Sequence, residues 1–105
     1  MKKVIFILFA LLLLSGCNNS IDPNEDLAKC ISEKATLYFS TGCSACAKQK
    51  DLFGDSYKYL EKVDCVVFPE KCREAGLRAV PTWIINGEII EGVQKLDKLK
   101  ELTNC

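Results

Sequence analysis

The sequence predicts an α/β fold in which a four-stranded mixed sheet is flanked by helices. Three observations lead to this prediction. A β-rich run at 35–40 is followed directly by helix-forming residues from 43 to 53, the pattern of a strand–helix–strand unit with parallel strands. Two later β runs enclose Asn86-Gly87, a dipeptide that favours a two-residue hairpin turn. Helices and strands alternate along most of the chain, as in single-domain α/β proteins.

Each predicted element has its own local signal. Asp22 is placed as an N-cap, with Pro23 at the first helical position and Glu25 three residues after the cap. Glycines end two later helices. The elements are a helix starting near residue 22, a strand at Ala35–Ser40, a helix at Cys43–Phe53 ended by Gly54, a strand at Tyr57–Val63, a short helix at Pro69–Ala75 closed by Gly76, strands at Thr82–Ile85 and Glu88–Ile90, and a helix at Leu96–Leu102.

The N-terminus reads as an export signal. Met1-Lys2-Lys3 is basic, and Val4 to Leu14 carries no charge, which is the pattern of a secretory signal peptide. A membrane-spanning helix needs about 20 apolar residues, so a permanent span is disfavoured. The run ends in Leu14-Ser15-Gly16-Cys17, which resembles a bacterial lipobox. That resemblance implies a lipid on Cys17; the alternative is an ordinary secreted protein with a chance cysteine.

This interpretation gives three segments and a nearly neutral mature chain. The whole sequence has 14 basic and 14 acidic residues. Removal of the signal takes away Lys2 and Lys3 and no acid, which leaves a net charge of −2. Such a surface gives no reason to expect nucleic acid as a partner. The segments are a lipoprotein signal peptide at 1–16, a tether with lipidated Cys17 at 17–21, and a folded domain at 22–105.

The Cys43-Ser44-Ala45-Cys46 segment is the strongest candidate for chemistry. It lies where a strand ends and a helix begins, so Cys43 meets unpaired backbone N–H groups and the positive end of the helix dipole. Both stabilise a thiolate, which makes Cys43 the nucleophile and Cys46 the resolving thiol. The alternative is a zinc site that adds Cys65 and Cys72. Their spacing is wider than usual for a zinc knuckle, and the chain has no His.

Val80-Pro81 provides a second marker, because a proline opens the predicted strand. Together with the Cys-x-x-Cys pair about 35 residues earlier, the hairpin and the terminal helix, it resembles thioredoxin. The resemblance implies a thioredoxin-like fold and a cis bond before Pro81. It also implies that substrate backbone binds at Val80 and Pro81, and we add Gly42, which precedes the first active-site cysteine.

A closer resemblance runs from about Asp26 to Leu102. It is to the thioredoxin-like domain fused to bacterial and plant homologues of vitamin K epoxide reductase, although this chain has Gly42 and Ser44-Ala45 where that family has an aromatic residue and Pro-His. In that family the soluble domain exchanges disulfides with substrate proteins, and a membrane domain that passes electrons to quinone re-oxidises it. The matching segments are Asp26-Leu27-Ala28-Lys29, Leu37-Tyr38, Cys43-Ser44-Ala45-Cys46-Ala47-Lys48-Gln49-Lys50, Leu52-Phe53-Gly54, Asp64-Cys65, Cys72-Arg73-Glu74-Ala75-Gly76, Pro81-Thr82-Trp83-Ile84-Ile85-Asn86-Gly87 and Glu91-Gly92-Val93.

The remaining cysteines have two interpretations each. By resemblance, Cys65 and Cys72 match a second family pair, either a relay that accepts electrons from the active-site pair or a local structural disulfide. Cys30 and Cys105 are left by elimination as a structural disulfide. It would close about 75 residues and stabilise the fold by about 4 kcal/mol. A free, surface-reactive Cys105 is the alternative.

The sequence therefore predicts a monomeric, free-standing lipoprotein of the cell envelope, anchored outside the cytoplasm. It would be a thiol–disulfide oxidoreductase that acts on cysteine-containing exported proteins through Cys43 and Cys46. Its cofactor would be its own redox-active disulfide, with no metal. By resemblance, its membrane partner is of the vitamin K epoxide reductase type and linked to quinone. The alternatives are a membrane-anchored reductase, for example in cytochrome c maturation, and a non-enzymatic metal-binding lipoprotein.

Overall fold

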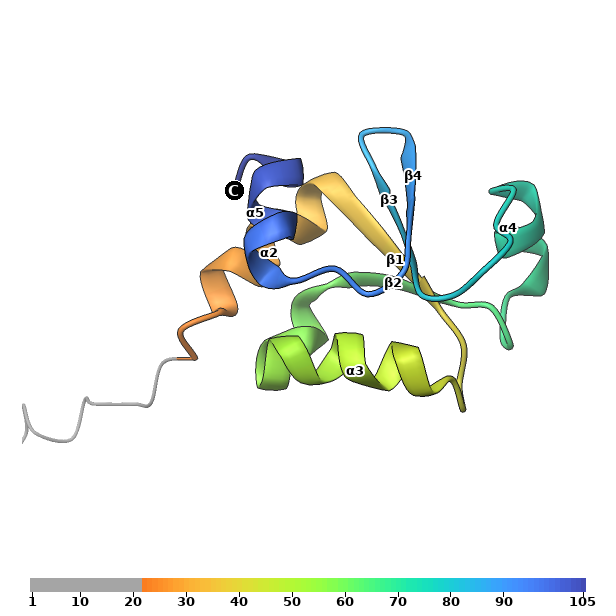
Figure 1. The fold of residues 1–105 in the computed structure, drawn as a ribbon, viewed down its shortest axis with the longest axis horizontal. Coiled ribbons are helices and arrows are strands. Elements are labelled where there is room, and N and C mark those ends of the chain that lie inside the picture. Colours follow the sequence, from red (N-terminus) through yellow and green to blue (C-terminus); the bar gives the residue numbers. More distant parts are fainter. Residues whose placement is uncertain (1–21) are drawn as a thin grey trace, which may run out of the picture.

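Four strands form one mixed sheet, and the fold class predicted from the sequence is confirmed (Figure 1). The structure is a computed structural model that describes residues 22–105. Strand β1 pairs in parallel with β2 and antiparallel with β3, and β3 pairs antiparallel with β4. The parallel pair is the one connected through a helix, as the geometry of parallel strands requires. In the order β2-β1-β3-β4, the strands are β2 (Glu61–Asp64), β1 (Ala35–Phe39), β3 (Thr82–Ile85) and β4 (Glu88–Glu91).

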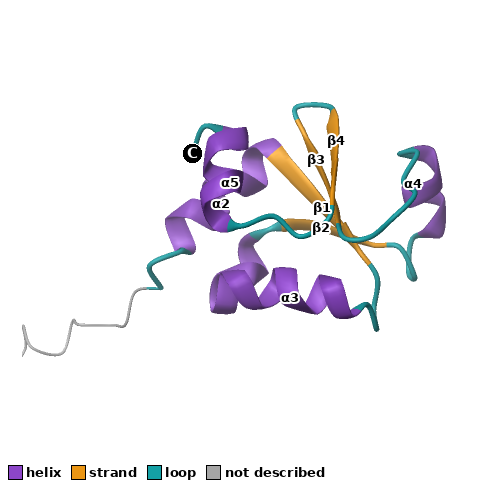
Figure 2. Cartoon of the chain, viewed as in Figure 1, coloured by secondary structure: helices purple, strands orange, loops and turns teal. Residues whose placement is uncertain are grey.

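Helices surround this sheet on several sides (Figure 2). Helix α3 lies along one side of the strands, while α2 and α5 pack together near the start of β1 and α4 lies beyond its end. Helix α3 follows β1 directly, so its N-terminus lies at the carboxyl end of that strand. The helices are α2 (Glu25–Lys34), α3 (Ser44–Phe53), α4 (Pro69–Glu74) and α5 (Leu96–Thr103), with a 3₁₀ helix, η1 (Gly54–Tyr59), after α3.

The hydrophobic core joins the sheet to α2, α3 and α5. Trp83 of β3 and Leu99 of α5 are fully buried, and Leu37 of β1 is nearly so. The ring of Phe53 packs against that of Trp83, with centroids 6.1 Å apart and a tilted geometry that is favourable for aromatic pairs. The end of α3 is thereby fixed against the sheet, and this fixes the direction in which its N-terminus points.

One polar side chain, Gln49 of α3, is completely buried in this core. Its Oε1 accepts hydrogen bonds from Trp83 Nε1 at 3.1 Å and from the Gln94 backbone N–H at 2.7 Å. Its Nε2 donates to the Gln94 carbonyl at 3.0 Å. Buried polar groups are costly unless they are paired, and here every polar atom of the amide has a partner. Gln49 therefore ties α3 to β3 and to the segment before α5.

Two predicted element boundaries were wrong. Helix α2 begins at Glu25 with Asn24 as its N-cap, not at Pro23, because the Asp22 carboxylate accepts a hydrogen bond from the Asn24 N–H at 3.0 Å and forms a turn first. The strand predicted at Tyr57–Val63 begins only at Glu61. The aromatic residues before it belong to η1, where the Ser56 hydroxyl donates to the Phe53 carbonyl at 2.6 Å and extends the helical path.

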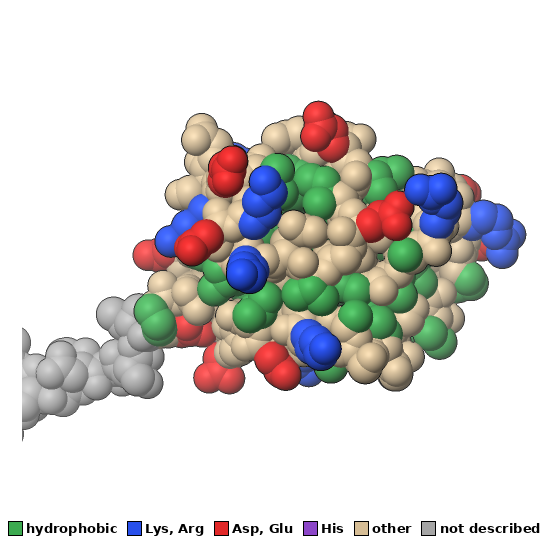
Figure 3. All heavy atoms as spheres, viewed as in Figure 1, with side chains coloured by type: hydrophobic (Ala, Val, Ile, Leu, Met, Phe, Trp, Pro, Cys, Tyr) green, Lys and Arg blue, Asp and Glu red, His purple; other side chains and the backbone are tan. Residues whose placement is uncertain are grey.

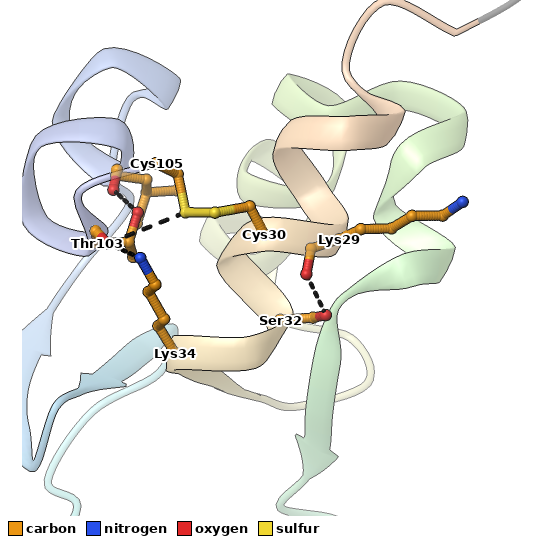
Figure 4. The surroundings of a disulfide bond; sticks show 7 residues. Lys29, Cys30, Ser32, Lys34, Thr103 and Cys105 are labelled. Carbon is orange, nitrogen blue, oxygen red and sulfur yellow. Dashed lines mark hydrogen bonds between the residues drawn. A yellow bond between two sulfur atoms is a disulfide. The ribbon is translucent and has the colours of Figure 1, made fainter.

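A disulfide joins Cys30 of α2 to Cys105 at the C-terminus (Figure 4). The two Cα atoms are 6.1 Å apart and the residues are 75 positions apart in sequence. Next to it, Lys34 Nζ donates a hydrogen bond to the Thr103 carbonyl at 2.9 Å, which satisfies an acceptor in the last turn of α5. These contacts fasten both ends of the described chain to each other.

The signal peptide at 1–16, the tether at 17–21 and the lipidated Cys17 lie outside the described residues. Among residues 22–105, no helix has the length and apolar character needed to cross a bilayer. On the face seen in Figure 3, basic and acidic side chains are interspersed with apolar ones.

Candidate active site

The turn between β1 and α3 places Cys43 at the start of a helix. Gly42 has φ +87°, a left-handed conformation that costs little only for glycine. The turn lets the Cys43 N–H donate to the Ser40 carbonyl at 3.3 Å. Cys43 then has an extended backbone and forms the N-cap of α3. Its sulfur thereby occupies the place usually taken by the oxygen of a capping Ser, Thr or Asp.

The Cys43 sulfur is half-buried and meets two backbone groups. The N–H of Cys46 donates to this sulfur at 3.1 Å. On the other side, the Cys43 thiol donates to the carbonyl of Val80 at 3.8 Å. The amide donor and the positive end of the helix dipole both lie where they stabilise negative charge that develops on this sulfur during disulfide exchange.

The thiol of Cys46 has a different environment. Cys46 is only 5% exposed, and it lies one turn into α3 from Cys43. Burial and, after it, the adjacent Cys43 sulfur together raise the pKa of the Cys46 thiol to about 11. The structure holds both as free thiols. One thiol is accessible and capped by an amide, whereas the other is buried and holds its proton at neutral pH.

The second sequence marker lies against this pair. The Val80–Pro81 peptide bond is cis, and Pro81 is buried while Val80 is half-buried. The Gly92 N–H donates to the Pro81 carbonyl at 2.8 Å. Val80, Pro81 and Gly42 are thus brought close to Cys43. Their assignment to substrate binding stays a prediction.

A cavity of about 320 Å³ opens beside the two thiols. Cys46 lines it together with Lys50, which lies four residues further along α3, and with Tyr57 of η1. The sequence indicates Lys50 only within the family resemblance and Tyr57 only as the first residue of a predicted strand. Sequence reasoning gave neither a role. The lining residues are Phe39, Ser40, Thr41, Gly42, Cys43, Cys46, Ala47, Lys50 and Tyr57.

Cys65 and Cys72 form a second disulfide next to the site, with Cα atoms 5.7 Å apart. It links the end of β2 to α4. Both cysteines also line a hollow of about 240 Å³ that extends to Val80. Because these two cysteines are bonded to each other, the four-cysteine zinc arrangement is not formed. Within residues 22–105 no group of three or more His, Cys, Asp or Glu side chains is placed to hold a metal ion.

The sheet order and the dithiol at the start of the helix after β1 define a thioredoxin-like fold, and solved thioredoxin structures share it. A thioredoxin mutant from Halobacterium salinarum superposes with a TM-score of 0.54 at 20% identity, covering 82% of this chain and 94% of that one. Schistosoma mansoni thioredoxin gives a TM-score of 0.50 at 28% identity, covering 76% and 86%.

The sequence is also similar to a longer protein. Thiol-disulfide oxidoreductase LTO1 of Arabidopsis thaliana is 35% identical over 80 residues, which cover 66% of this chain but only 21% of that relative. The chain therefore corresponds to about a fifth of its length. Residues 1–18 match the family of prokaryotic membrane lipoprotein lipid attachment sites. This match supports a lipid-anchored, membrane-associated protein of the cell envelope.

Proposed function

We propose that the chain is an extracytoplasmic thiol–disulfide oxidoreductase, anchored through a lipid on Cys17, that exchanges disulfides with exported proteins. The observation that supports this most directly is the Cys43 sulfur at the N-cap of α3, with the Cys46 N–H as its hydrogen-bond donor at 3.1 Å. The relative LTO1 is itself named as a thiol-disulfide oxidoreductase. We expect no metal or other cofactor beyond the Cys43–Cys46 disulfide.

In the proposed oxidising direction, a substrate thiolate attacks the sulfur of Cys43 in the oxidised pair. The S–S bond breaks, its electron pair goes to Cys46 as a thiolate, and a mixed disulfide remains between Cys43 and the substrate. A second substrate thiolate then attacks the substrate sulfur and releases Cys43 as a thiolate. The substrate gains a disulfide, and the pair gains two electrons. A quinone-linked membrane protein of the vitamin K epoxide reductase type would re-oxidise the pair.

The surroundings of the site support a polypeptide substrate. Val66 and Val67 are each 62% exposed and Phe68 is 48% exposed, all within the loop closed by the second disulfide. Exposed apolar groups of this kind are typical of protein contact surfaces. The hollow beside that disulfide reaches Val80, whose carbonyl meets the Cys43 thiol. A substrate chain that reaches Cys43 along this hollow would pass the apolar side chains of Leu77, Ala79 and Val80.

The reduction potential of the Cys43–Cys46 pair tests the proposal and decides the direction. The protein would be equilibrated in glutathione or dithiothreitol buffers, and free thiols would be counted by mass-tagged alkylation, with Cys43→Ser and Cys46→Ala variants as controls. A potential of about −120 to −200 mV would support the oxidant, whereas about −270 mV or lower would support the reductase instead. If these two cysteines never formed a disulfide with each other, the oxidoreductase proposal would be wrong.

A further inference from the structure

The proposed exchange requires a negative charge on a buried sulfur. In the oxidising direction Cys46 leaves as a thiolate when a substrate attacks Cys43. In the reducing direction Cys46 must lose its proton before it attacks the mixed disulfide. With 5% exposure, its sulfur has little access to bulk water. A buried charge without enough partners is strongly disfavoured. Backbone hydrogen bonds from Ser40 and Cys46 lower the pKa of this thiol but do not offset its burial, so a side-chain donor close to the sulfur would stabilise the thiolate further.

The cavity beside Cys46 offers few candidate donors from side chains. Its lining carries the hydroxyls of Ser40, Thr41 and Tyr57 and the ammonium of Lys50. The Thr41 hydroxyl is already used, because it donates to Asp64 Oδ2 at 2.7 Å. Lys50 is exposed, and its Nζ lies 5.6 Å from the centre of the Tyr57 ring. Two half-buried hydroxyls of the lining remain, those of Ser40 and Tyr57, and neither makes a hydrogen bond among residues 22–105. We choose Tyr57 because its phenol lies close enough to Cys46 for a charge on that sulfur to raise the pKa of Tyr57.

The position of Tyr57 is fixed by its neighbours. Lys62 of β2 donates to the Tyr57 carbonyl at 2.8 Å and to the Leu60 carbonyl at 3.1 Å. The Lys62 ammonium also lies 4.7 Å from the centre of the Tyr57 ring, within the range of a cation–π contact. A side chain held in this way loses little further freedom when it forms a hydrogen bond.

The charges around the cavity keep the phenol in its protonated form. Burial raises the pKa of Tyr57, and the negative charges of Cys46 and Asp64 raise it further. The groups concerned come from three elements: Cys43, Cys46 and Lys50 at α3, Tyr57 in η1, and Lys62 and Asp64 in β2. Because Tyr57 holds its proton through the neutral range, it can donate a hydrogen bond but does not act there as a base.

We infer that the Tyr57 hydroxyl donates a hydrogen bond across this cavity to the Cys46 sulfur whenever that sulfur is a thiolate. The inference rests on the proposed function and adds a residue to its site. In the reducing direction, the Cys46 proton passes to solvent, the thiolate attacks the Cys43 sulfur, the Cys43–substrate bond breaks, and the electron pair leaves with the substrate sulfur. In the oxidising direction, the same hydrogen bond stabilises Cys46 as the leaving group.

The test uses the full chain in detergent, reduced at the dithiol, and 5,5′-dithiobis(2-nitrobenzoate) as the probe. Attack by Cys43 releases one coloured thiolate at a rate that depends on probe concentration. Attack by Cys46 on the mixed disulfide releases a second at a rate that does not. We expect Tyr57→Phe to slow the second phase by about tenfold, the scale of one hydrogen bond to a charged group, and to move its pH profile to higher pH. The first phase should be unchanged.

Tyr59→Phe is the matched control, because Tyr59 lies in the same 3₁₀ helix and also packs against the core but does not line the cavity. It should leave both phases unchanged. An unchanged second phase in Tyr57→Phe, or a loss seen in Ser40→Ala instead, would overturn the inference. If the wild-type chain releases only one equivalent, Cys46 does not resolve the mixed disulfide, and the proposed function fails rather than the role of Tyr57.

Discussion

Removal of the disulfide between Cys30 and Cys105 should cost more stability than removal of the one between Cys65 and Cys72. The first bridge closes 75 residues and the second closes seven. A chain-entropy model gives about 4.5 kcal/mol for the longer loop and about 2.4 kcal/mol for the shorter one at 25 °C. A domain of this size has only about 5–10 kcal/mol of total stability. Loss of the longer bridge should therefore bring the domain close to unfolding.

Burial of the cysteine side chains reduces this difference in stability between the two variants but does not remove it. Cys30 is half-buried and Cys105 is exposed, so their replacement by alanine removes little packing. Cys72 is only 8% exposed, and its truncation adds up to about 1 kcal/mol to the cost of the shorter bridge. The double variant Cys30→Ala/Cys105→Ala should still lose at least about 1 kcal/mol more than Cys65→Ala/Cys72→Ala.

Urea denaturation followed by the fluorescence of Trp83, the single tryptophan, measures both variants. The dependence of the unfolding free energy on urea concentration should also become steeper in the variant that lacks the Cys30–Cys105 bridge. Without that bridge the unfolded chain is less constrained and exposes more surface. Equal costs, or a larger cost for the shorter bridge, would show that native packing and not chain entropy determines the contribution of these disulfides.

Three other predictions concern the core and the dithiol turn. Gln49→Leu should cost about 3 kcal/mol in urea denaturation, because the buried Trp83 Nε1–H and the Gln94 N–H lose their acceptor; a cost below 1 kcal/mol would contradict this. The folded pKa of Cys46, about 11, lies above the usual 9.0 of a cysteine thiol, so its contribution to stability is full below pH 9 and is lost as the pH rises to 11. Cys46→Ala should remove that part of the decline, and identical pH profiles would refute it. Gly42→Ala should cost about 1–2 kcal/mol through strain at φ +87°; since an added Cβ meets nothing within 4 Å, an unfolded variant would indicate a contact that the structure does not contain.

Features encoded by neighbouring residues could be predicted from the sequence. The hairpin at Asn86-Gly87 needs two positive φ values, and these are the residues that adopt them, at 51° and 82°. The turn into α3 depends in the same way on Gly42. The position of Cys43 at the start of that helix could therefore be read from a few adjacent residues.

Features that depend on contacts between residues far apart in sequence could not be predicted from the sequence. Gln49 looks like any surface residue of a helix, because its partners Trp83 and Gln94 are 34 and 45 positions away. Tyr57 has high strand propensity, but the preceding Ser56 hydroxyl donates back to the Phe53 carbonyl and keeps this turn helical. Its place in the cavity beside Cys46 follows from the packing of η1 between α2 and α3, which no local pattern reveals.

The capping role of Cys43 links two equilibria through a single atom. Its sulfur accepts the Cys46 N–H as a helix cap, and the same sulfur forms the S–S bond of the oxidised pair. In a thermodynamic cycle of folding and reduction, any cap energy present only in the reduced form must appear as an equal change in redox equilibrium. A cap is worth about 1 kcal/mol, which for a two-electron couple corresponds to about 20 mV toward a stronger oxidant. Substitutions at the start of α3 that change helix stability in only one redox form should therefore also change the reduction potential.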